Sequence, residues 1–109
     1  MKILLISDNT WVKESFDKYL DFDHELTHID EYESINHYFD YIFVDMQVQN
    51  NGGPSIIREL KRANSSKNSY MVLIADRDAD EIQAKRGEAD GVMVKPFTKS
   101  KLNNFFNLN

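Results

Sequence analysis

Short apolar runs recur along this chain, and segments with helical spacing separate them. Four of the five runs are unbroken and rich in valine, isoleucine, leucine or aromatic residues, which is typical of strands covered on both faces in a parallel sheet. The second run contains Thr27 and His28 and is predicted to be an edge strand. The five predicted strands comprise residues 2–6, 26–29, 41–44, 70–75 and 91–94.

Helical patterns fill the segments between these strands. In the first helix, residues 11–20, Thr10 is expected as the N-cap and Asn9 is the alternative. Proline in the first turn indicates the start of a helix, and glycine after the last turn indicates its end. Pro54 and Gly87 have these places, and Thr98 is the expected N-cap of the last helix. The remaining helices are predicted over residues 31–39, 54–63, 78–86 and 98–106.

The alternation of strand and helix predicts an α/β fold. Right-handed crossovers would place helices on both faces of a doubly wound, five-stranded parallel sheet of the flavodoxin-like type. The common strand order for such a small domain is 2-1-3-4-5, and a ligand would bind at the carboxyl ends of the strands near the order reversal. With 109 residues, the sequence predicts one domain over residues 1–109.

Composition narrows the classes of function. The formal net charge is −5 and the two signs are interspersed, which argues against nucleic acid as a partner, because phosphate binding needs a clustered basic face. No apolar run approaches the roughly 20 residues of a membrane-spanning helix, so no membrane partner is expected. The chain has no cysteine, which is compatible with a reducing cytosol.

Three charged residues are predicted to meet at the carboxyl edge of the sheet. Asp8 follows the first strand, Asp45 ends the third, and Lys95 ends the fifth. Two nearby carboxylates suit Mg²⁺, and a lysine beside them can pair with a carboxylate or an incoming phosphate. Together they suggest phosphoryl transfer to an aspartate. The acidic run that starts at Asp76 is interpreted as a solvated helix start.

The motifs that contain these residues resemble the receiver domain of bacterial two-component response regulators (the CheY-like family). They are Lys-Ile-Leu-Leu-Ile-Ser-Asp-Asn (2–9), Tyr-Ile-Phe-Val-Asp-Met-Gln (41–47), Gly53 and Val-Met-Val-Lys-Pro-Phe (92–97). The resemblance implies that Asp45 is the phosphoacceptor and Lys95 the lysine of the family motif. It also implies a weak Mg²⁺ site formed by Asp8, Asp45 and the backbone carbonyl of Gln47.

The same resemblance implies a signalling protein rather than an enzyme. Its expected partners are a histidine kinase or phosphotransfer protein upstream and a downstream protein or effector domain. The expected location is cytoplasmic.

Departures from the family pattern leave a second interpretation open. Ser7 stands where the family has a first acid, and Ile74 stands where it has a threonine or serine. Val92 replaces the aromatic switch residue, and the loop after Asp45 has no proline before Gly52. The alternative is therefore a pseudo-receiver that signals without phosphorylation. A flavodoxin-like cofactor-binding protein is a third possibility, disfavoured because the loop after the first strand is acidic and bulky.

Overall fold

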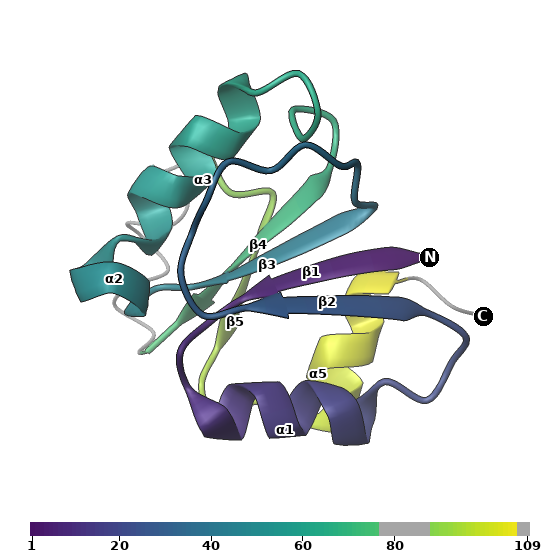
Figure 1. The fold of residues 1–109 in the computed structure, drawn as a ribbon. Helices are drawn as coiled ribbons and strands as arrows, with labels where there is room; N and C mark the ends of the chain where they lie inside the picture. Colours follow the sequence, from purple (N-terminus) through teal and green to yellow (C-terminus); the bar gives the residue numbers. More distant parts are fainter. Residues whose placement is uncertain (77–87, 107–109) are drawn as a thin grey trace.

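Five parallel strands form one sheet in the computed structural model, which describes residues 1–76 and 88–106 (Figure 1). The strand order is β2-β1-β3-β4-β5, so the predicted topology and the edge position of β2 are confirmed. Each predicted strand is present, within one residue at either end. The strands are β1 (Lys2–Ile6), β2 (Glu25–Ile29), β3 (Tyr41–Asp45), β4 (Tyr70–Ala75) and β5 (Gly91–Val94).

Helices cover both faces of the sheet (Figure 1). One face packs against α1 (Thr10–Tyr19), α5 (Lys99–Asn103) and the 3-10 turn η1 (Asn104–Phe106). The other packs against α2 (Val48–Asn51) and α3 (Gly53–Arg62). Each face has its own buried cluster because side chains alternate across a strand. In β3, for example, Phe43 packs on the α1–α5 side and Val44 on the α3 side.

The ends of the helices follow local chemistry. Asn9, rather than Thr10, is the N-cap of α1: its Oδ1 accepts hydrogen bonds from the amides of Trp11 and Val12 at 2.9 and 3.3 Å. Thr10 is the first helical residue, so its prediction as the cap was wrong. Thr98 caps α5 as predicted. The predicted helix at residues 78–86 lies outside the described residues.

The helix predicted over residues 31–39 is absent, and an extended segment connects β2 to β3. Neighbouring side chains satisfy its backbone in place of helical hydrogen bonds. Gln49 accepts from the amide of Tyr32, and the hydroxyls of Ser65 and Ser69 donate to the carbonyls of Ile35 and Phe39. Several residues of the segment, such as asparagine and histidine, are also modest helix formers.

Within the described ranges, no helix is both long enough and apolar enough to span a bilayer.

Candidate functional site

The carboxyl ends of three neighbouring strands bring Ser7, Asp45 and Ile74 to one face of the sheet. Alternation along β3 places Asp45 on the same side as Phe43, which faces α1 and α5. The parallel register pairs Asp45 directly with Ile74 of β4. Ser7 directly follows β1 and continues the same alternation, two residues after Leu5, which faces that side too.

The carboxylate of Asp45 is buried and accepts three hydrogen bonds from the chain. Its Oδ2 accepts from the hydroxyl of Ser7 at 2.8 Å. Its Oδ1 accepts from Nζ of Lys95 at 2.9 Å and from the amide of Gln47 at 3.2 Å. The side chain is only 1% exposed. Both oxygens of Asp45 therefore have partners within the fold, as a buried charge requires.

Lys95 links this carboxylate to a second one. Its ammonium lies 2.7 Å from Oδ1 of Asp76, which directly follows β4. Burial is the largest single influence and lowers the pKa of Lys95, but the hydrogen bonds to Asp76 and Asp45 and the charges of these two acids together outweigh it and raise that pKa. The lysine is thus held in its charged form between two acids.

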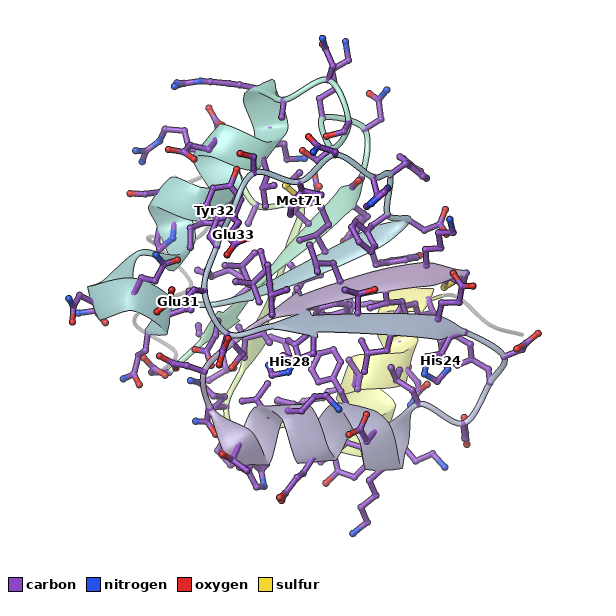
Figure 2. All side chains as sticks on the ribbon, viewed as in Figure 1. His24, His28, Glu31, Tyr32, Glu33 and Met71 are labelled. Atoms are coloured by element: carbon purple, nitrogen blue, oxygen red, sulfur yellow. The ribbon has the colours of Figure 1, made fainter. Side chains whose placement is uncertain are left out.

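Ser7 is fully buried and its position is fixed by the backbone around it. Its hydroxyl accepts a hydrogen bond from the amide of Asn9 at 3.1 Å while it donates to Asp45. Its amide donates to the carbonyl of Ile29 at 3.0 Å. On the α1 side of β2, Nε2 of His28 donates to the Ser7 carbonyl at 2.7 Å (Figure 2). Ser7 therefore presents its hydroxyl to Asp45 from a rigid position.

A shallow pocket of about 420 Å³ lies beside Lys95. Trp11, which is 40% exposed, forms part of its wall, and its ring lies 5.1 Å from that of Phe97. Asp45 does not line this pocket. The described residues that do are Asn9, Trp11, Gln47, Asp76, Lys95 and Pro96.

Of the residues predicted to form the site, the structure joins three and leaves one apart. Asp45, Lys95 and Gln47 are connected by hydrogen bonds. Asp8 is exposed, and its carboxylate takes part in none of the hydrogen bonds or ion pairs of the described residues. The roles assigned to these residues stay predictions.

The carboxylate of Asp45 already has partners where Mg²⁺ is predicted to bind. Nowhere in residues 1–76 and 88–106 do three or more histidine, aspartate or glutamate side chains gather as metal ligands. An ion at Asp45 would compete with the hydrogen bond from Ser7 and with the charge of Lys95. Magnesium binding at this site therefore stays a prediction.

Ile74 and Val92, which stand where the receiver family has a hydroxyl residue and an aromatic residue, lie on opposite faces of the sheet. Ile74 is fully buried in the α1–α5 cluster beside Asp45, whereas Val92 is partly buried and packs with the α3 cluster. Gly53 lies close against the end of β3, because a Cβ there would lie 2.7 Å from the carbonyl oxygen of Asp45. The β3–α3 connection is built around this close approach.

Sequence reasoning missed two members of this network. The acidic run predicts a solvated helix start at Asp76, although Asp76 follows a predicted strand just as Asp8 does. That position at the carboxyl edge of the sheet was the available signal. Ser7 was recognised as a missing acid but not as a hydrogen-bond donor to Asp45, which depends on a distance between two strands.

Comparison with known proteins places the fold. No protein-family model matches the chain, and no curated protein sequence matches it. Among solved structures, the chemotaxis response regulator CheY4 of Vibrio cholerae is 18% identical with a TM-score of 0.84, covering 96% of this chain and 94% of that one. The receiver domain of the sensor histidine kinase PA1611 from Pseudomonas aeruginosa, with a magnesium ion in its active-site cleft, is 16% identical with a TM-score of 0.77, covering 95% and 92%.

A third similar structure is the BeF3-activated receiver domain of DrrB, a Thermotoga maritima response regulator. It is 17% identical with a TM-score of 0.77 and covers 96% of this chain and 92% of that one. The resemblance seen in the motifs is thus confirmed at the level of the whole fold. This chain has the CheY-like fold of response regulator receiver domains.

Proposed function

We propose that this chain is a receiver-type signalling domain that acts through protein contacts while Asp45 stays unphosphorylated. The observation that carries the proposal is the closed hydrogen bonding of Asp45, which is 1% exposed and bound by Ser7, Lys95 and Gln47. In this proposal Asp45 is a structural anion that joins the ends of β1, β3 and β5.

The chemistry of phosphoryl transfer supports this choice. A carboxylate nucleophile needs one free oxygen in line with the phosphorus, and the transferred group needs donors and cations around it. Here the oxygen on the Ser7 side accepts a hydrogen bond, and the neighbouring Ile74 can donate none. Attack through Oδ2 of Asp45 would compete with the contact to Ser7, which engages one of the two lone pairs of that oxygen.

A phosphoaccepting receiver is the second candidate, favoured by the 2.9 Å pair between Lys95 and Asp45. Lys95 could neutralise an incoming phosphoryl group from a kinase or phosphotransfer protein. Neither candidate turns over a small-molecule substrate, so we propose a signalling role rather than an enzyme.

The two candidates differ in their response to a phosphoryl mimic. We expect beryllofluoride with Mg²⁺ to leave the amide NMR spectrum of the wild-type chain almost unchanged. A phosphoaccepting receiver would show shifts around Asp45 and Lys95, and a switching one would show them through Val92 and α5 as well. Either result would overturn the proposal, and Asp45→Asn serves as the control for non-specific effects of the salt.

A further inference from the structure

The place of the missing helix is occupied by a groove. Residues 30–40, here called the crossover segment, run beside α3 on their way from β2 to β3 (Figure 1). The segment is held on that side by the hydrogen bonds from Tyr32 to Gln49 and from Ser65 to Ile35, both 2.7 Å long. The groove between it and the edge of the sheet has a volume of about 420 Å³.

Apolar side chains line the inner part of this groove. Leu4 of β1 and Phe39 are buried there, at 1% and 7% exposure. Ile29 of β2 and Ile35 of the crossover segment are half-buried and pack against the α3 cluster. A helix on this face would cover these side chains, whereas the extended segment leaves room beside them.

The rim of the groove is acidic. Asp30, Glu31 and Glu33 line it and are exposed, and no lysine or arginine of the described chain does so. Glu31 and Glu33 project from the crossover segment (Figure 2). Tyr38 of the same segment is 51% exposed, and exposed aromatic residues are enriched at protein interfaces.

We propose that this groove binds a basic amphipathic segment of a partner protein. An apolar side chain of the partner would enter between Ile29 and Ile35, and lysine or arginine residues beside it would face Glu31 and Glu33. Charge complementarity selects this occupant, because the rim and the net charge of −5 both disfavour an acidic peptide, an anionic lipid surface or a second copy of the chain. The site is separate from Asp45 and does not depend on its phosphorylation.

The test uses a short amphipathic leucine–lysine helical peptide with a fluorescent label, and its leucine–glutamate counterpart as the negative probe. We expect the basic peptide to bind and to shift the amide resonances of Thr27, Ile29 and residues 30–37. The double variant Glu31→Gln/Glu33→Gln should weaken binding about tenfold, and Ile35→Ser should weaken it too.

A matched control separates the groove from general attraction. Glu14→Gln/Asp23→Asn removes the same two negative charges from exposed positions away from the groove and should leave the Kd nearly unchanged. Equal weakening by this control would overturn the proposal, as would shifts centred on another face or no binding of the basic peptide. Thermal melts of each variant establish that the domain is folded in every comparison.

Discussion

Carboxylates are buried and hydrogen-bonded in one region of this molecule and exposed to solvent in another. At the carboxyl edge of the sheet, Asp45 is 1% exposed and bound by a hydroxyl, an amide and an ammonium group. Along the crossover segment, Glu31 and Glu33 face solvent at the rim of a groove. The carboxylate of the first region has its hydrogen-bond partners within the chain. The carboxylates of the second region are free to interact with another molecule.

This contrast shows why a fold alone does not locate a binding site. The strand ends bring together the residues predicted to form a site, yet here hydrogen bonds within the fold engage both carboxylate oxygens of Asp45. The side with the missing helix has gained a groove instead. The two regions therefore predict different consequences of mutation, large for stability in the first and large only for binding in the second.

The largest effect on stability is expected from removing the charge of Lys95. Lys95→Met leaves Asp45 buried without its ionic partner, which should lower the free energy of unfolding by about 3 kcal/mol. Chemical denaturation measures it. Adding Asp45→Asn should recover part of the loss, because an amide needs no counter-ion. Lys99→Met is the matched control: its pair with Asp21 is exposed, so little change is expected, and an equal loss there would contradict the account.

A smaller loss of stability should follow when an acid replaces Ser7, where the receiver family has one. Ser7→Asp places a second carboxylate beside Asp45, and repulsion between them should cost about 2 kcal/mol in metal-free buffer. Mg²⁺ should then raise the melting temperature of this variant while leaving that of the wild type almost unchanged. Ser55→Asp, on the exposed face of α3, adds the same charge as a control. A wild-type melting temperature that rises equally with Mg²⁺ would show that the native site already fits the ion.

The same network predicts a pH dependence at alkaline pH. The pKa of Lys95 is raised above its ordinary value of 10.5, so its contribution to stability is complete below that pH. The contribution is lost as the pH rises through the raised pKa of the folded state. We therefore expect the stability difference between wild type and Lys95→Met to be constant from about pH 7 to about pH 10 and to shrink above pH 10. A difference that already falls near neutral pH would contradict this assignment.

The smallest effect on stability is expected at the groove. Glu31→Gln/Glu33→Gln should change the free energy of unfolding by less than about 0.5 kcal/mol, because both side chains are exposed. Denaturation of this variant beside Lys95→Met measures the contrast between the two regions. A large loss at the groove would mean that these acids stabilise the crossover segment itself.

Hydrophobic pattern alone predicts the sheet well, and the reason is local. The unbroken runs around Phe43 and Val72 are buried on both faces, so their apolar character reports their place in the sheet directly. Strand order then brings Asp45 and Lys95 together at one edge. These features follow from the periodicity of the chain and the geometry of a parallel sheet.

Other features depend on contacts that no local pattern contains. The crossover segment has helical spacing at Tyr32, Ile35 and Phe39, but side chains from distant parts of the chain bind its backbone in an extended form. The ion pair of Asp76 with Lys95 likewise requires a distance between two strand ends. Contacts between residues far apart in the sequence therefore determine both the extended crossover segment and the position of Asp76.

The central claim is that Asp45 is closed to phosphoryl transfer, and intact mass after incubation with acetyl phosphate and Mg²⁺ tests it most directly. We predict no added phosphoryl group on the wild-type chain, and a gain in the variant Ser7→Asp/Ile74→Thr, which supplies the family acid and hydroxyl beside Asp45. The gain should disappear when Asp45→Asn is added to that variant. A phosphoryl group on the wild-type chain that is lost in Asp45→Asn would contradict the account.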